Sequence, residues 1–227
     1  MVLIKGLNKT CLIDYEPYTS CVIFLGGCNF RCSYCHNPDL VLGKVKSLDR
    51  EEIFRYLKEA KEKKIDGVCI CGGEPTIHKD LPQFIEEIKK LGLKVKLDTN
   101  GSNPDVLKKC QVDYIAMDVK TSLNEYHKIC WIKGMGEKIK ESIDYLINQN
   151  KIDYEFRTTL VPELVGSDEL MEISKLLKNA KRWFLQNYSS KKTLDPHFEE
   201  IKPYSLETIN KLMENLKKTN QSVFYRY

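Results

Sequence analysis

The sequence lacks a long hydrophobic run, a low-complexity tract, a repeat and a linker rich in proline, glycine or serine. No apolar segment reaches the ~18 residues that a membrane-spanning helix needs, so we expect no membrane span. The chain opens without the pattern of a secretory signal, and we expect a cytoplasmic protein with reduced thiols. Basic residues exceed acidic ones by only 36 to 32, a net charge of +4, which argues against nucleic acid as a partner.

Cysteine, by contrast, is abundant. The chain has nine cysteines among 227 residues, with 42% hydrophobic and 30% charged residues, a composition typical of a globular protein. A chain of this length can bury roughly 70–75% of its unfolded surface and needs no disulfides to fold. We therefore expect some of the thiols to bind metal.

Apolar periodicity alternates along the chain between short runs, typical of buried strands, and helices with one apolar face. Strands are predicted at residues 20–25, 67–71, 93–97, 114–119, 153–161, 182–186 and 223–227, and helices at 48–63, 81–91, 104–110, 136–148, 168–179 and 206–216. We expect a single domain over residues 1–227, with a core of about 18–190 and a C-terminal helix and short strand within 203–227. The alternation predicts an α/β fold with a parallel sheet and right-handed crossovers.

The number of strand–helix units bears on the type of sheet. Six units are fewer than the eight of a complete barrel of ~250 residues. Periodicity alone leaves open a doubly wound sheet and an incomplete barrel, while six units in a chain of this length favour a partial (β/α)6 TIM-type barrel with parallel strands. In both folds function gathers at the carboxyl ends of the strands, where Cys28, Glu74, Asp98 and Asp118 fall.

Three cysteines, Cys28, Cys32 and Cys35, follow the first predicted strand with the spacing C-x3-C-x2-C. Three thiols within eight residues cannot all pair with one another, so a disulfide interpretation is poor. Three thiolate ligands leave one position open, on a catalytic zinc or on one iron of a [4Fe–4S] cluster. The structural alternative is a zinc site completed by His36 or a distant cysteine, although no second ligand pair with matching spacing is present.

The cysteine motif carries a resemblance to a known family. The spacing C-x3-C-x2-C with Tyr34 before the third cysteine resembles the signature of the radical S-adenosylmethionine (SAM) superfamily. The extension His36 to Asp39 resembles the activating enzymes of glycyl-radical enzymes, such as pyruvate formate-lyase and anaerobic ribonucleotide reductase. The resemblance runs from about Lys5 to Gln186. It departs at 14–17, where Asp-Tyr-Glu-Pro replaces the usual Asp-Tyr-Pro-Gly.

The resemblance implies a set of site residues. Cys28, Cys32 and Cys35 would hold a [4Fe–4S] cluster whose fourth iron binds SAM. SAM contacts are implied for Tyr34, His36, Gly72, Gly73, Glu74, Asp98, Asn100, Lys120, Arg157 and Gln186, and a possible monovalent cation for Asp98, Thr99 and Asp118. Within these, Gly-Gly-Glu would take the methionine ammonium group. Taken alone, Gly-Gly-Glu-Pro is equally typical of a turn, and Asp98 and Asn100 could merely cap one.

The function implied by the resemblance is reductive cleavage of SAM to methionine and a 5′-deoxyadenosyl radical that abstracts hydrogen. The implied substrate is a glycine of a partner glycyl-radical enzyme, with flavodoxin or ferredoxin as electron donor. Two alternatives stay open: a radical SAM enzyme that modifies a small molecule or nucleobase, and a non-catalytic, zinc-stabilised binding module. The other six cysteines are most simply packing residues. His78, His127 and His197 show no ligand spacing, and we expect them at the surface or in loops.

Overall fold

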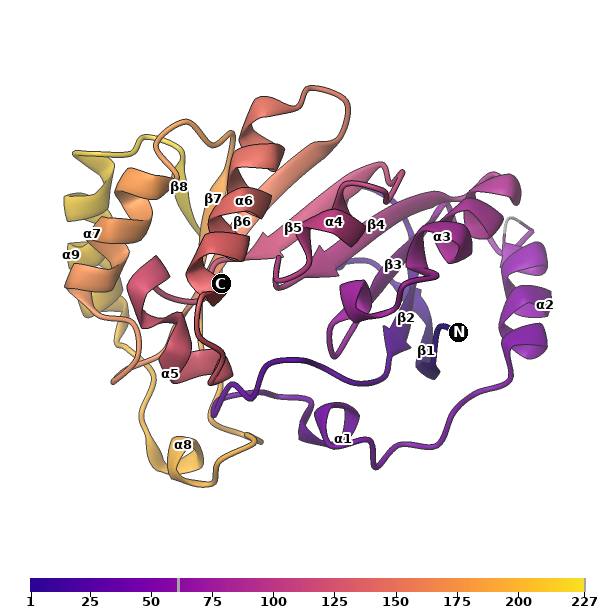
Figure 1. Ribbon diagram of the computed structural model, residues 1–227, viewed down its shortest axis with the longest axis horizontal. Coiled ribbons are helices and arrows are strands. Elements are labelled where there is room, and N and C mark those ends of the chain that lie inside the picture. The colour runs from indigo at the N-terminus through magenta and orange to yellow at the C-terminus, as the bar shows by residue number, and fades with distance from the viewer. Residues whose placement is uncertain (61, 227) are drawn as a thin grey trace. The chain divides into compact units, whose positions relative to one another are not determined.

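The computed structural model describes residues 1–60 and 62–226. Its strands are β1 (Ile4–Cys11), β2 (Ser20–Leu25), β3 (Gly67–Gly72), β4 (Lys94–Thr99), β5 (Tyr114–Asp118), β6 (Asp153–Leu160), β7 (Trp183–Asn187) and β8 (Val223–Arg226). Its helices are α1 (Pro38–Val41), α2 (Arg50–Ala60), α3 (Leu81–Lys90), α4 (Pro104–Leu107), α5 (Tyr126–Cys130), α6 (Met135–Asn148), α7 (Ser167–Leu176), α8 (His197–Glu200) and α9 (Leu206–Lys217). Two short 3-10 turns are η1 (Pro75–Ile77) and η2 (Leu123–Glu125). Strands and helices alternate along the colour ramp of Figure 1.

The chain divides into two compact units, which we describe separately. The first unit comprises Met1–Asn29, Asp39–Thr99 and Asn103–Ile115, and the second comprises Phe30–Pro38, Asn100–Ser102 and the chain from Ala116 onward. Strand β5 spans the boundary, because its first two residues belong to the first unit and the rest to the second. The segment that carries the cysteine motif is divided between the units in the same way.

The first unit is built on four neighbouring strands. Strands β2, β3 and β4 are parallel, with Val22 opposite Cys69 and Cys69 opposite Lys96. Successive residues of β2 and β3 are buried, among them Ile23 and Ile70, as the short apolar runs predict for strands covered on both faces. Asp49 caps α2, since its Oδ1 accepts a hydrogen bond from the amide of the second helical residue at 2.8 Å.

Strand β1, which pairs antiparallel with β2, was not predicted. Its sequence is Ile-Lys-Gly-Leu-Asn-Lys-Thr-Cys, and only its first and last residues are buried. A strand at the margin of a sheet can be polar because it does not have to bury both faces, so it lacks the apolar run that reveals an interior strand.

The second unit is built on β6, β7 and β8, which are parallel, with Arg157 opposite Phe184 and Phe184 opposite Phe224. The Trp183 side chain is completely buried, and its indole N–H donates to Thr158 Oγ1 at 2.9 Å. The predicted helices at 136–148, 168–179 and 206–216 are confirmed as α6, α7 and α9. Two residues within the predicted elements, Lys61 and Tyr227, lie outside the described residues.

An ion pair ties β8 to β6 in the second unit. The Arg226 guanidinium donates to both carboxylate oxygens of Glu155, at 3.0 and 2.9 Å, and lies 3.9 Å from the centroid of the Phe184 ring. The Glu155 side chain is only 4% exposed, whereas Arg226 is 41% exposed. Removing the arginine would therefore deprive a buried carboxylate of two charge-assisted hydrogen bonds.

We expect Arg226→Met to lower the free energy of unfolding by about 2 kcal/mol, the scale of hydrogen bonds to charged groups. The control is Lys211→Met, because Lys211 pairs with Glu207 on the exposed surface of α9. Loss of that exposed pair should change the free energy of unfolding by less than ~0.5 kcal/mol. Urea denaturation measures both variants. Equal, small losses for the two would mean that the Glu155 pair contributes no more than a surface pair.

No helix among residues 1–60 and 62–226 has both the length and the apolar character needed to cross a membrane.

Candidate functional site

In the first unit the turn after β3 rests directly on the end of β2. The amide of Gly73 donates to Leu25 O at 2.9 Å, and the amide of Glu74 donates to Gly27 O at 2.8 Å. Gly72 has a φ of +126°, a conformation that other residues rarely adopt. A Cβ on Gly73 would stand 1.8 Å from Gly27 O. The close approach of the two backbones explains why both turn positions are glycine.

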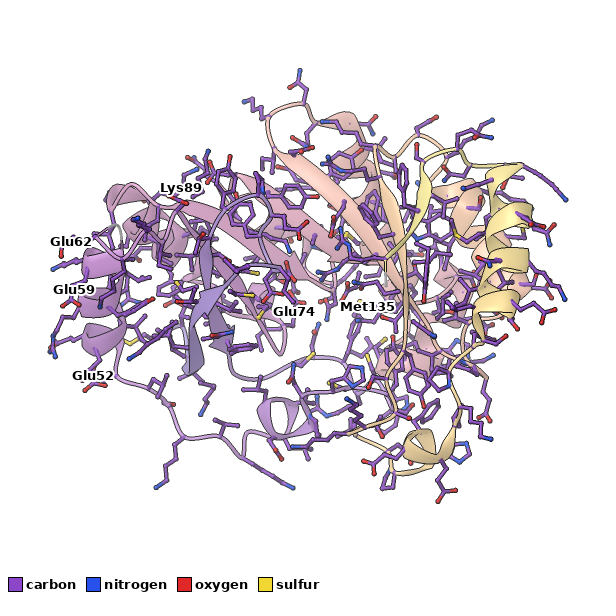
Figure 2. All side chains as sticks on the ribbon, turned by 180° about the vertical axis from the view of Figure 1, so that it is seen from behind. Glu52, Glu59, Glu62, Glu74, Lys89 and Met135 are labelled. Atoms are coloured by element: carbon purple, nitrogen blue, oxygen red, sulfur yellow. The ribbon has the colours of Figure 1, made fainter. Side chains whose placement is uncertain are left out.

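The carboxylate of Glu74 joins the ends of β3 and β4. Its Oε1 accepts hydrogen bonds from the Thr76 amide at 3.0 Å, the Thr76 hydroxyl at 2.5 Å and the Thr99 hydroxyl at 2.6 Å. Glu74 has no exposed surface. In Figure 2 it lies among the strands, whereas Glu52 and Glu59 project outward from α2. The role of Glu74 toward an ammonium group stays a prediction, and the structure adds its role in fixing the turn.

A histidine that the sequence did not single out supports the same turn. His78 lies in the loop before α3, but it is buried rather than at the surface, with 9% exposure. Its Nε2 lies 3.0 Å from Gly26 O, so the ring N–H donates to that carbonyl. Burial lowers the pKa of His78, and the hydrogen bond to Gly26 only partly opposes this. No local pattern reveals this contact, because the two residues lie far apart in the sequence.

The lowered pKa of His78 predicts a pH dependence of stability. The unfolded chain takes up a proton near pH 6.5, whereas the folded chain does so only at lower pH, so the His78 contribution is present above pH 6.5 and is lost as pH falls. We expect wild type to lose more free energy of unfolding between pH 7.5 and 5.5 than His78→Gln, whose amide keeps a donor but does not titrate. Urea denaturation at the two pH values measures the difference. An identical loss in both proteins would contradict the assignment.

The end of β4 carries a charged pair, Asp98 and Lys96. Asp98 Oδ1 lies 3.1 Å from Lys96 Nζ, and both side chains are largely buried, at 17% and 8% exposure. The thiol of Cys69 approaches the same carboxylate oxygen at 3.7 Å. Lys96 also donates to the main-chain oxygen of Asp14 at 2.5 Å. Asp98 is thus held in the first unit by its neighbours on β3 and β4.

The part of the cysteine motif that lies in the second unit forms a tight turn, in which the amide of Cys35 donates to Cys32 O at 3.0 Å. Cys32 is buried and Cys35 is half-buried. Burial raises the pKa of the Cys32 thiol to about 11, although the positive charge of Lys120 works in the opposite direction. The Tyr34 hydroxyl is buried and has no hydrogen-bond partner among the described residues. An orphaned buried hydroxyl costs free energy, which a ligand able to hydrogen-bond there would recover.

The end of β5 in the second unit holds an ion triad. Asp118 Oδ1 lies 2.9 Å from Arg157 Nε, and its Oδ2 lies 3.2 Å from Lys120 Nζ. Burial opposes ionisation of Asp118, but Arg157 and Lys120 outweigh it and hold its pKa at about 2. The amide of Lys120 donates to the Tyr126 hydroxyl at 3.0 Å. One carboxylate against two cations leaves this triad with a net positive charge.

Of the remaining predicted residues, Asn100 is buried in the second unit and its Oδ1 accepts from the Ser102 amide at 2.9 Å. This is the turn-capping arrangement that the sequence left open for Asn100. His36 is exposed, with Nδ1 3.1 Å from Lys192 O. Gln186 lies half-buried on β7.

The structure thus gathers the predicted residues into two sets. Gly72, Gly73, Glu74, Asp98 and Thr99 lie at the strand ends of the first unit, together with Cys28. Tyr34, His36, Asn100, Asp118, Lys120, Arg157 and Gln186 lie in the second, together with Cys32 and Cys35. In the described part of the chain no three His, Cys, Asp or Glu side chains form a preassembled metal-binding group. The assignment of the three cysteines to one cluster therefore rests on their spacing in the sequence.

The chain has a parallel α/β fold with charged groups at the carboxyl ends of its strands, where folds of this class place their functional sites. The family model described as "Radical SAM superfamily" matches residues 22–180. The chain belongs to the radical SAM superfamily.

The relatives include activating enzymes. A protein of Methanocaldococcus jannaschii, provisionally named a glycyl-radical enzyme activating enzyme, is 34% identical over 207 residues, 88% of this chain and 85% of that one. A pyruvate formate-lyase-activating enzyme of Clostridium pasteurianum is 28% identical over 94% of this chain and 96% of that one. A Methanococcus maripaludis protein, provisionally named a GTP 3′,8-cyclase, is 31% identical over 53% of this chain and 42% of that one.

Among solved structures, Streptococcus suis SuiB bound to the precursor peptide SuiA matches with a TM-score of 0.70 at 17% identity, over 91% of this chain and 48% of that one. A similarity at this identity concerns the fold alone. The predicted fold class, an α/β partial barrel built on parallel strands, is confirmed. Strand β1 is an antiparallel addition to it.

Proposed function

We propose that this protein is a radical SAM activating enzyme that abstracts a hydrogen atom from a glycine of a partner glycyl-radical enzyme, such as anaerobic ribonucleotide reductase. The observation that carries the proposal is the C-x3-C-x2-C motif with its aromatic residue and His-Asn-Pro-Asp extension. Similarity to activating enzymes over most of the chain supports it. We place the protein in the cytoplasm, as a single functional domain.

In this proposal Cys28, Cys32 and Cys35 hold a [4Fe–4S] cluster, and SAM binds beside it. The residues present fit these groups: soft thiolates suit iron, and the orphaned Tyr34 hydroxyl offers an unused hydrogen bond. When bound, the reduced cluster and SAM supply the one-electron cleavage that generates the hydrogen-abstracting species. Flavodoxin or ferredoxin is the proposed electron donor.

The chain's own groups bind and orient SAM in complementary ways. The half-buried Gly72–Gly73 turn, which the end of β2 holds in place, is the proposed backbone contact for the methionine portion. Lys120 and Arg157 suit the carboxylate of SAM, since their triad with Asp118 keeps a net positive charge. Oxygen ligands from Asp98, Thr99 and Asp118 are proposed for a monovalent cation. His36, Asn100 and Gln186 remain further proposed contacts.

The test begins with protein purified without oxygen. We expect about four iron and four sulfide ions per chain, as one [4Fe–4S] cluster contains. The reduced protein should give an electron paramagnetic resonance signal, and it should produce 5′-deoxyadenosine when SAM is added. Co-expression with an anaerobic ribonucleotide reductase should then give a glycyl-radical signal.

Each alternative predicts a different outcome of that test. Deoxyadenosine without a glycyl signal, for any co-expressed glycyl-radical enzyme, would favour a radical SAM enzyme acting on a small molecule or nucleobase. One zinc per chain without iron or sulfide would favour the zinc-stabilised binding module and would falsify the radical proposal.

A further inference from the structure

The segment between β7 and α9, residues 188–205, folds on itself. We call it the β7–α9 segment. The Tyr188 hydroxyl donates to Ile201 O at 2.9 Å and also to Phe198 O. Both side chains are buried, with Tyr188 3% and Phe198 5% exposed. Asn187 Nδ2 donates to Tyr204 O at 3.0 Å and holds the two ends together. A loop whose ends are joined and whose interior is cross-linked by hydrogen bonds is an ordered element and not a flexible connection.

The tip of this segment contacts the cysteine turn of the same unit at two points. The amide of Asp195 donates to Ser33 O at 2.9 Å. His36 Nδ1 lies 3.1 Å from Lys192 O, so the ring N–H donates to that carbonyl. Ser33 and His36 stand on either side of Cys35 in the chain. The segment therefore holds both flanks of one proposed cluster ligand, and it does so through its main chain.

The tip itself is fixed from within the segment. The Thr193 hydroxyl donates to Asp195 O at 2.7 Å, and its amide donates to Glu199 Oε1 at 3.1 Å. Thr193 is 6% exposed, and both bonds are partly shielded from solvent. The Asp195 amide is consequently presented to Ser33 by a rigid support. The cysteine turn, in contrast, belongs to no helix or strand.

We propose that the β7–α9 segment positions the Cys32–Cys35 turn, with His36 and the Asp195 amide as its two points of attachment, and that this support slows loss of the bound cluster. The inference rests on the proposed function, because it assumes that Cys32 and Cys35 bind iron. His36 is then a positioning residue. Tyr188 acts through the segment that it holds together.

The test measures the rate at which an iron chelator removes iron from the anaerobic holoprotein in the absence of SAM. We expect His36→Ala to release iron about 5-fold faster, the effect of one hydrogen bond of ~1 kcal/mol. His36→Asn should restore the wild-type rate, since its side-chain amide keeps a donor close to the position of Nδ1. A residue that only touched SAM would not change a rate measured without SAM.

Two further variants distinguish a specific effect of the β7–α9 segment on the cysteine turn from a general loss of protein stability. Tyr188→Phe removes both hydroxyl bonds inside the segment and should also accelerate iron release, together with amide exchange at Asp195 in the metal-free protein. His197→Ala is the matched control, because His197 lies in the segment but pairs with Glu163 on the exposed surface. We expect it to release iron at the wild-type rate.

The outcomes of this experiment are separable from those of the proposed function. If wild type binds no iron at all, the proposed function fails. If wild type binds the cluster but His36→Ala and Tyr188→Phe release iron at the rate of His197→Ala, the proposed function stands and the positioning role of the segment is overturned.

Discussion

Gly73→Ala is expected to destabilise the first unit and to abolish SAM binding. The new Cβ would stand 1.8 Å from Gly27 O and 2.5 Å from the carbonyl carbon of Gly27, both main-chain atoms that cannot rotate away. Two backbone hydrogen bonds hold the turn in place, so one of them must break for the methyl group to fit. We expect the free energy of unfolding to fall by about 3 kcal/mol, the upper range for overpacking. Urea denaturation and equilibrium dialysis with SAM measure the two effects.

The control for this variant is Gly166→Ala, at the start of α7. There a Cβ would meet only the tip of the Glu169 side chain, at 3.3 Å, which can move aside. We expect the free energy of unfolding to fall by no more than ~1 kcal/mol, the scale of losing a favoured N-cap residue, with SAM binding retained. If Gly73→Ala behaved like this control, the turn would not be the rigid backbone cradle that we describe.

Cys32→Ala is expected to abolish cluster assembly and SAM cleavage while leaving a folded chain. The thiolate supplies one of only three protein ligands, so two sulfurs would remain for a cluster that needs three. Loss of one buried sulfur atom should lower the free energy of unfolding by only about 1 kcal/mol, at the low end of large-to-small core changes. Iron and sulfide analysis of the anaerobic protein, with circular dichroism for the fold, gives both results.

Cys130→Ala provides the matched control. Cys130 is buried like Cys32, and its thiol donates to Tyr126 O at 3.0 Å, but it lies outside the cysteine motif. We expect this variant to keep the full iron and sulfide content. Deoxyadenosine production by Cys32→Ala would mean that the three cysteines are wrongly assigned, and loss of iron from Cys130→Ala would extend the ligand set beyond them.

The predicted elements show where sequence reasoning works. The strand at 20–25 and the helices at 81–91 and 136–148 were predicted to within about two residues, because apolar periodicity reports directly on which face is buried. Strand β1 was missed because it pairs with β2 alone and only its first and last residues are buried. Its sequence therefore lacks the apolar run that marks an interior strand. The short helices α1, α5 and α8 have four or five residues each, too few for a period to emerge.

The site residues divide in the same manner. The cysteine spacing and the glycine turn were visible in the sequence because their chemistry is local: several thiols within one loop, and two glycines after one strand. The Glu74 contact with Thr99, the His78 contact with Gly26 and the pairing of Asp118 with Arg157 were not. Each joins residues from different strands or loops, and a hydrogen bond between distant positions leaves no periodic trace.

The sequence by itself determined the alternation of strands and helices, the position of the cysteine motif, and hence the family. These features depend on spacing along the chain. Only the tertiary structure decided that Glu74 is buried as an acceptor of hydroxyl bonds, that ionised Asp118 pairs with two cations, and that the β7–α9 segment contacts the cysteine turn. These depend on which side chains and carbonyl groups meet when distant strands and loops pack, and so on the burial and charge that each group experiences in the folded protein.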